Sequence, residues 1–81
     1  MDSVYYKHFK GKYYKFLYEA KMTETLEDVI VYKCLYGDGG IWARPKSMFF
    51  EIISRDGYTG PRFFPVSREE VISNVDPIFN P

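Results

Sequence analysis

Apolar residues recur at every second position over residues 14–22, a period typical of a β-strand that buries one face. They are Tyr14, Phe16, Tyr18, Ala20 and Met22. A polar stretch, 23–28, interrupts this pattern. The run that follows, residues 29–36, is β-branched and aromatic and starts apolar on both faces. It therefore predicts a central strand.

Turn signals divide the next part of the chain into short strands. Residues 37–40, Gly-Asp-Gly-Gly, predict a turn because these residues accept positive φ, and the strand after them stops at Pro45. Residues 46–50 fit either one helical turn or the start of a fourth strand, whereas 51–54 are extended. A second tight hairpin is expected at 55–58. Gly60-Pro61 is expected to break the chain before a short edge strand at 62–64.

The C-terminal residues predict a helix over about 68–74. Ser67 and Glu70 have capping-box spacing, in which Ser67 accepts a hydrogen bond from the amide three residues on and Glu70 reaches back. The apolar residues expected to dock this helix on a sheet are Val71, Ile72 and Val75.

These elements predict a mainly β fold, namely a small bent antiparallel sheet or SH3-like barrel with about five strands and a short C-terminal helix. Closing a barrel would remove exposed sheet edges. The alternative is a simple curved sheet backed by the helix. The length of 81 residues fits a single domain, residues 1–81.

Composition narrows the class of protein. Apolar residues make up 46% and charged residues 27%, as in a globular domain. Eleven basic and eleven acidic residues cancel, so no overall field attracts nucleic acid or membrane. The sequence has no apolar run near the length of a membrane span and no apolar secretory core at its start. With one Cys and one His, we expect no metal, no cofactor and a cytoplasmic location.

The zero net charge conceals an uneven distribution. Residues 1–15 hold four lysines and one aspartate, a balance of +3, and residues 19–38 hold five acidic residues and two lysines, a balance of −3. One interpretation is that two solvated strand faces attract each other across the sheet. The other is a local basic patch.

Several motifs occur in an order and spacing that carry a resemblance. They are Tyr6-Lys7-His8-Phe9-Lys10-Gly11, Thr23-Glu24-Thr25 with Glu27, Val31-Tyr32-Lys33, Leu35-Tyr36-Gly37-Asp38, Trp42-Ala43-Arg44-Pro45 with Met48-Phe49, and Gly57 followed by Pro61-Arg62-Phe63. Together they resemble a small bacterial family known as domain of unknown function 1653. The resemblance covers a β core over residues 5–64 and leaves a C-terminal helix and tail, 65–81, outside.

The resemblance implies a small, mainly β domain and carries no established activity or ligand. The family pattern usually has His where this chain has Met22, and Val where it has Ala43. If a His at the first position does chemistry in the family, this chain has lost it.

The third predicted strand carries the main candidate surface. If the turn occupies 37–40, Tyr36 pairs with Ile41, and Trp42 lies opposite Leu35. One face of this hairpin must be core, and the other is then an aromatic or cationic platform. A one-residue slip exchanges the two faces. The alternative is that Trp42 and the tyrosines belong to the core, with their hydroxyl groups reaching outward.

Two arginines, Arg44 and Arg62, each adjoin a proline, and a guanidinium fork suits carboxylates and phosphates. Each arginine forms either a structural ion pair or an anion site. The expected structural partners are Glu51, Glu24 or Glu27.

We therefore predict a non-catalytic binding module for a peptide, a protein or single-stranded nucleic acid. The candidate binding residues are Lys7, His8, Lys10, Tyr36, Trp42, Arg44 and Arg62. One alternative is a small enzyme or enzyme accessory domain that uses His8 with Glu24 or Glu27 and contains a group with a shifted pKa. Another is a protein–protein adaptor, as a monomer or a weak homodimer.

Overall fold

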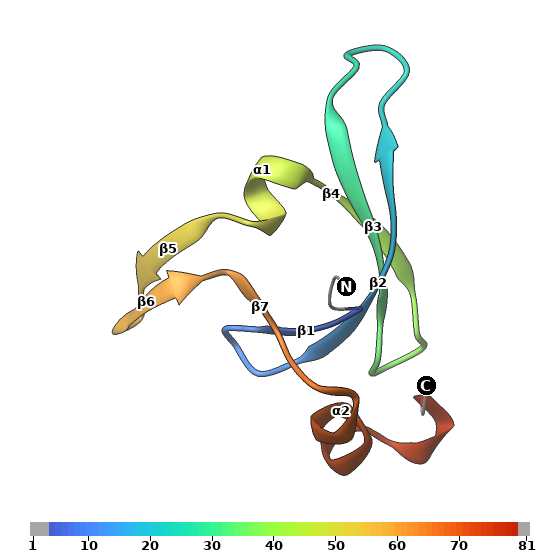
Figure 1. The fold of residues 1–81 in the computed structure, drawn as a ribbon, viewed down its shortest axis with the longest axis vertical. Coiled ribbons are helices and arrows are strands. Elements are labelled where there is room, and N and C mark those ends of the chain that lie inside the picture. Colours follow the sequence, from blue (N-terminus) through green and yellow to red (C-terminus); the bar gives the residue numbers. More distant parts are fainter. Residues whose placement is uncertain (1–3, 80–81) are drawn as a thin grey trace.

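The computed structural model describes residues 4–79, which form seven strands, two short α-helices and one 3-10 turn (Figure 1). The strands are β1 (Tyr5–His8), β2 (Tyr13–Lys21), β3 (Asp28–Cys34), β4 (Ile41–Pro45), β5 (Ile52–Arg55), β6 (Tyr58–Pro61) and β7 (Phe63–Pro65). The helices are α1 (Lys46–Phe49) and α2 (Arg68–Asn74), and the 3-10 turn is η1 (Pro77–Phe79).

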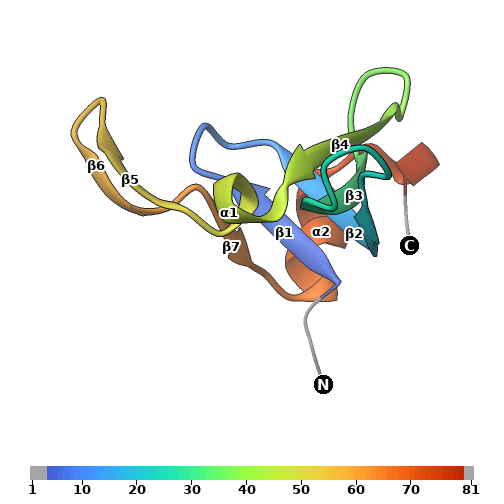
Figure 2. The same ribbon diagram turned by 90° about the horizontal axis from the view of Figure 1, so that it is seen from above.

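Five strands form an antiparallel sheet in the order β4-β3-β2-β1-β7, and β5 and β6 form a separate hairpin that projects from it (Figures 1 and 2). The mainly β prediction and the central position of the strand after residue 28 are confirmed. Over residues 4–79 the sheet stays open, with β4 and β7 as its outer strands. The structure is therefore the bent sheet with a C-terminal helix, and the sheet does not close into a barrel. Neither helix in this part of the chain has the length or apolar character to cross a membrane.

The β2–β3 hairpin differs from its predicted pattern because it contains a bulge. Phe16 lies opposite Tyr32, but Tyr18 lies opposite Val31, so the register shifts between Phe16 and Tyr18. A bulge reverses the alternation of faces beyond it. Tyr18 is consequently 67% exposed, and the prediction that every second residue through Met22 is buried is wrong beyond Phe16.

The β3–β4 connection is longer than predicted. Trp42 lies opposite Tyr32, so the predicted pairings of Trp42 with Leu35 and of Tyr36 with Ile41 are wrong. The reason is that Leu35 continues to pair with β2, where its N–H donates to a carbonyl at 3.0 Å, and its side chain is buried. The chain needs the extra loop residues to return along β3.

Local turn signals are confirmed more closely. Residues 46–49 form the helical turn α1, and the 55–58 hairpin turns at Asp56 and Gly57, whose φ angles of 56° and 77° suit a tight turn with two left-handed residues. Gly60-Pro61 lies inside β6, so the break in the chain falls one residue later, at Arg62.

The sheet carries a core on each face. On the face covered by α1, the α1 face, the buried residues are Tyr6, Ile30, Tyr32, Phe49 and Phe63. On the face covered by α2 and η1, the α2 face, they are Tyr5, Tyr13, Leu35 and Val71, with Val66, Val75 and Phe79 packed against them. In Figure 1, α1 lies above β1 and β7, and α2 lies below them.

The predicted N-cap of α2 is confirmed. The Ser67 hydroxyl accepts from the Glu70 N–H at 3.0 Å. The Glu70 carboxylate accepts a hydrogen bond from the Tyr13 hydroxyl at 2.7 Å, which ties the helix to β2. Val71 is fully buried, but Ile72 is 40% exposed, so the prediction that Ile72 docks the helix is wrong. The next residue along a helix points about 100° away from a buried position.

Candidate functional site

The seven predicted binding residues divide between two regions of the sheet. His8, Trp42 and Arg44 lie on the α1 face, because their cross-strand partners are Phe63, Tyr32 and Ile30. Arg62 lies between β6 and β7 and acts electrostatically on His8. Lys10 is exposed in the β1–β2 turn, and Lys7 and Tyr36 line a cleft beside α2 and η1.

Trp42 and Arg44 stand next to each other on one face of the outer strand β4. Trp42 is 61% exposed, so the interpretation that places it in the core is wrong, whereas its partner Tyr32 is buried. The guanidinium of Arg44 lies 5.5 Å from the centre of the Phe63 ring, and its Nε is 3.5 Å from the Tyr32 hydroxyl. No carboxylate of residues 4–79 pairs with Arg44. This guanidinium is thus oriented by rings and keeps its charge uncompensated.

His8 lies among cations. Its ring packs 4.9 Å from Phe63, and its Nδ1 accepts the Lys10 N–H at 3.1 Å. Burial, as the largest cause, together with the nearby positive charges of Arg44, Arg62, Lys10 and Arg55 lowers the pKa of His8 from 6.5 to about 4. The imidazole is therefore neutral at pH 7, and the charged groups that act on it are all basic.

Of the two roles considered for the arginines, Arg62 has the structural one, with Glu51 as its partner. Its guanidinium pairs with Glu51 at 2.9 Å, and its backbone N–H donates to the Glu51 carbonyl at 2.8 Å. Its Nε is buried without a hydrogen-bond partner. The occluded guanidinium of Arg62 is held in place, so Arg44 is the arginine available to a ligand.

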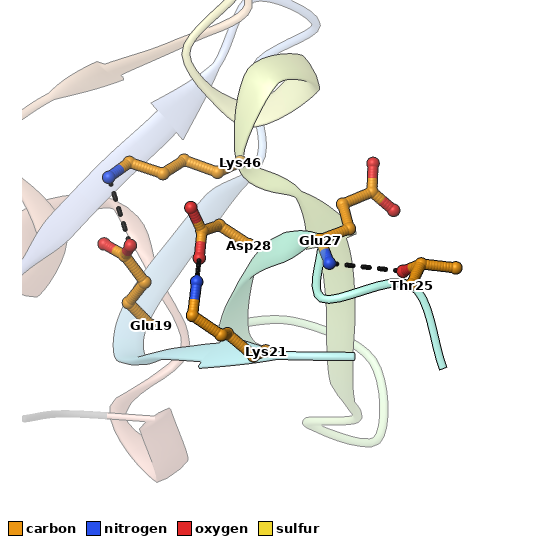
Figure 3. Close-up of polar contacts among 6 residues, drawn as sticks. All are labelled: Glu19, Lys21, Thr25, Glu27, Asp28 and Lys46. Carbon is orange, nitrogen blue, oxygen red and sulfur yellow. Dashed lines mark hydrogen bonds and ion pairs between the residues drawn. The ribbon is translucent and has the colours of Figure 1, made fainter. Parts of the chain in front are cut away.

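The acidic residues lie at the tip of the β2–β3 hairpin, away from His8. Figure 3 shows the ion pairs Lys21–Asp28 (2.6 Å) and Lys46–Glu19 (3.1 Å), and the Glu27 N–H donating to the Thr25 hydroxyl at 3.2 Å. Glu24 and Glu27 follow the end of β2, whereas His8 lies beside its start. The structure therefore does not bring His8 together with either glutamate.

The positions of the ion pairs bear on the two interpretations of the uneven charge along the chain. The ion pairs at the hairpin tip join the acidic stretch to Lys21 and Lys46, and no lysine of residues 4–15 forms an ion pair with a described residue. Lys15 instead lies opposite Lys33. Among residues 4–79 no ion pair joins the two stretches, which favours the interpretation of a local basic patch.

Two adjoining clefts lie where this patch meets η1. One, of about 610 Å³, includes Lys7, Lys12 and Tyr36, and the other, of about 400 Å³, includes Lys15 and Lys33. The Tyr36 hydroxyl is 3.0 Å from that of Tyr14, and burial is the main cause that raises the pKa of Tyr14. Lys12, Lys15 and Lys33 are not among the site residues predicted from the sequence, although the excess of lysine in residues 1–15 is a signal for part of this patch. Over residues 4–79, no three His, Cys, Asp or Glu side chains gather into a metal-binding group.

The fold and the sequence both place this chain among known relatives. A search of curated proteins found no match. The crystal structure of a protein belonging to the DUF1653 family from Bordetella bronchiseptica is similar, with 32% sequence identity and a TM-score of 0.72 over 82% of this chain and 87% of that chain. The profile of the family described as "Protein of unknown function (DUF1653)" matches residues 4–65. The chain therefore belongs to the DUF1653 family.

Proposed function

We propose that this protein is a small non-catalytic binding module that takes up an extended acidic peptide as an additional strand beside β4. The binding surface consists of Ile41, Trp42, Ala43 and Arg44, which we call the β4 surface. The observation that carries the proposal is that unpaired backbone groups and an uncompensated arginine occur together on this outer strand.

The backbone geometry follows from the ladder with β3. The Cys34 N–H donates to the Gly40 carbonyl at 2.9 Å, and the register continues from there to Tyr32 opposite Trp42. In an antiparallel ladder, directly opposed pairs alternate between bonded and non-bonded. The N–H and C=O groups of Ile41 and Ala43 therefore point away from β3, and such a row is a template for a further strand.

The side chains of the β4 surface add the energy and the specificity. Trp and Arg are the residue types that most often dominate binding energy at interfaces, and both Trp42 and Ile41 are more than half exposed. The planar guanidinium of Arg44 can accept a carboxylate in a bidentate arrangement. The other basic groups around His8 reinforce the preference for a negative ligand.

A peptide fits this surface better than single-stranded nucleic acid does. Nucleic acid requires a series of stacking rings along a basic groove. Trp42 is the exposed aromatic ring of β4, and the chain has no net charge. The separation of His8 from Glu24 and Glu27 favours binding over catalysis. We also propose a cytoplasmic location, because the single cysteine, Cys34, is a free buried thiol.

The test is an NMR titration of amide chemical shifts with an extended peptide of alternating Val and Glu. We expect shifts centred on β4, and slowed hydrogen exchange at the amides of Ile41 and Ala43. The Arg44→Gln variant should weaken binding about tenfold, as expected for a charged hydrogen-bonded pair. Lys12→Gln also removes one positive charge, but from the cleft beside α2 and η1, and should have little effect on peptide binding. A peptide N-methylated at alternate residues cannot join the ladder and should not bind.

Other results would overturn the proposal. Equal binding of the N-methylated peptide would exclude strand addition. Shifts caused by an oligothymidylate and not by the peptide would assign the surface to nucleic acid. Sedimentation of the free protein as a dimer, with Ile41 and Ala43 already protected, would assign the free edge of β4 to a second copy of this chain.

A further inference from the structure

We infer that the protein has a second binding site, on the α2 face, where Lys15 and Lys33 hold the phosphate group of a small phosphorylated compound. This site, which we call the lysine cleft, lies on the opposite face of the sheet from Trp42 and Arg44. It rests on separate observations from the β4 surface.

The first observation is a pair of like charges placed side by side. Lys15 and Lys33 are directly opposed on the neighbouring strands β2 and β3. Two residues beyond Lys33, the Leu35 N–H donates to the Tyr13 carbonyl at 3.0 Å. Because hydrogen-bonded pairs recur at every second residue of an antiparallel ladder, Lys15 and Lys33 also form a hydrogen-bonded pair, with Cα atoms about 5.5 Å apart. Like charges in this position destabilise a sheet. Their presence is explained if an anion binds between them.

The second observation is that neither lysine forms an ion pair. No carboxylate of residues 4–79 pairs with Lys15 or Lys33, although Lys21 and Lys46 both form ion pairs. Asp38 also lines the cleft, but its Oδ1 accepts a hydrogen bond from the Gly40 N–H at 3.1 Å and so caps its own turn.

The third observation is the shape of the site. The lysine cleft has a volume of about 400 Å³, within the range typical of small-molecule pockets. Both lysines are half-buried, as expected when the aliphatic stems lie against the protein and the ammonium groups stay within reach of a ligand in the cleft. Gly39, with φ of 71°, brings the loop against Lys33, where a Cβ on Gly39 would lie 3.6 Å from the Lys33 Nζ and 3.2 Å from the Phe79 ring. The loop and η1 thus form walls on either side of Lys33.

The charge identifies the class of ligand. A carboxylate brings one negative charge, whereas a phosphate monoester brings nearly two at pH 7 and several acceptor oxygens, which match two ammonium groups. The cleft shares Leu35, Ile78 and Phe79 with the larger cleft that holds Lys7 and Lys12. The remainder of a phosphorylated compound therefore has room to extend along η1.

The test uses inorganic pyrophosphate as the probe, added at low salt and followed by amide chemical shifts and by the midpoint of thermal unfolding. We expect binding that shifts β2, β3 and η1 and raises the midpoint. Lys15→Gln and Lys33→Gln should each weaken pyrophosphate binding about tenfold. Each should also raise the midpoint without pyrophosphate, because the repulsion is gone. Lys10→Gln, an exposed lysine outside both clefts, should do neither.

Several results would overturn the lysine cleft. They are an absence of pyrophosphate binding, an equal loss of binding in Lys10→Gln, or a lower midpoint in the unliganded Lys15→Gln and Lys33→Gln variants. An oligothymidylate serves as the second arm. If it competes with pyrophosphate and depends on Lys33, the phosphate comes from a nucleic-acid backbone. The β4 surface is tested independently, since Arg44→Gln should leave pyrophosphate binding unchanged.

Discussion

The two faces of the central sheet differ in how they are packed. On the α1 face the core consists of aromatic rings in direct contact, with Phe49 stacked on Phe63 at 4.3 Å and Tyr6 edge-on to Phe49 at 5.2 Å. On the α2 face the core is a mixture of aliphatic side chains and tyrosines, and a hydrogen bond from Tyr13 to Glu70 joins the sheet to the helix. The α1-face core is therefore held together by contacts between aromatic rings, whereas the α2-face core combines aliphatic contacts with a hydrogen bond.

The faces also differ in which part of the chain covers them. α1 and β7 lie within residues 4–65, which match the family, whereas α2 and η1 follow that match. Their cations differ as well, with Arg44 on the α1 face and Lys7, Lys15 and Lys33 on the α2 face. The aromatic core of the α1 face therefore lies within the part of the chain that matches the family. The lysine cleft also uses η1, which lies beyond that match.

The largest effect on stability is expected when one buried side chain is truncated on each face. Phe49→Ala should lower the free energy of unfolding by about 3–5 kcal/mol, because it leaves a cavity among the rings of Tyr6, Tyr32, Phe50 and Phe63. Val71→Ala removes two methyl groups and should cost about 1–2 kcal/mol. Urea denaturation measures both. Hydrogen exchange in Val71→Ala should accelerate in α2 and leave β3 protected, and an equal cost for the two variants would remove the proposed distinction.

The next test uses His8, the single histidine of the sequence, which lies on the α1 face. Its pKa of about 4 when folded lies below the unfolded value of 6.5, so between these values the unfolded chain binds a proton that the folded chain does not. Stability is therefore lost as the pH falls from about 6.5, and the loss levels off below about 4. Because the ring is partly exposed, the loss should be about 1–2 kcal/mol.

The matched variant for this test is His8→Asn, whose amide oxygen can still accept the Lys10 N–H but does not titrate. The difference in unfolding free energy between the native protein and His8→Asn, measured by urea denaturation at several pH values, isolates His8 from the carboxylates. A constant difference from pH 7 to pH 4 would contradict the cationic environment of the ring.

Features that depend on a few adjacent residues could be predicted from the sequence. The Asp56-Gly57 turn, the Ser67 cap and the helix at 68–74 each follow from the conformational preferences of neighbouring residues. The interior position of β3 also follows, because a run that is apolar on both faces is expected to be shielded on both sides.

Register could not be predicted in the same way. The bulge after Phe16 and the pairing of Leu35 with β2 depend on which side chains the two cores accept. The shifted β3–β4 pairing affected a candidate site, because it decides that Trp42 and Arg44 lie on the α1 face. The pairing of Lys15 with Lys33 joins residues that are far apart in sequence. The alternation of side chains along a single strand reveals neither the face of Trp42 and Arg44 nor the pairing of Lys15 with Lys33.

The smallest test concerns the hydrogen bond that joins α2 to the sheet. Tyr13→Phe removes the hydroxyl that donates to Glu70 at 2.7 Å and keeps the ring, over which the Lys7 Nζ lies at 5.4 Å from the centroid. It should cost about 1 kcal/mol in unfolding free energy. Tyr18→Phe is the control, since the Tyr18 hydroxyl is exposed and bonds to no residue of the described chain. Burial raises the pKa of Tyr13 to about 12, and its bond to Glu70 contributes, so Glu70→Gln should bring the ultraviolet titration of this tyrosine to lower pH. If Tyr13→Phe and Tyr18→Phe were equally stable, nonpolar packing alone would hold α2 in place, and the two faces would differ only in the size of their side chains.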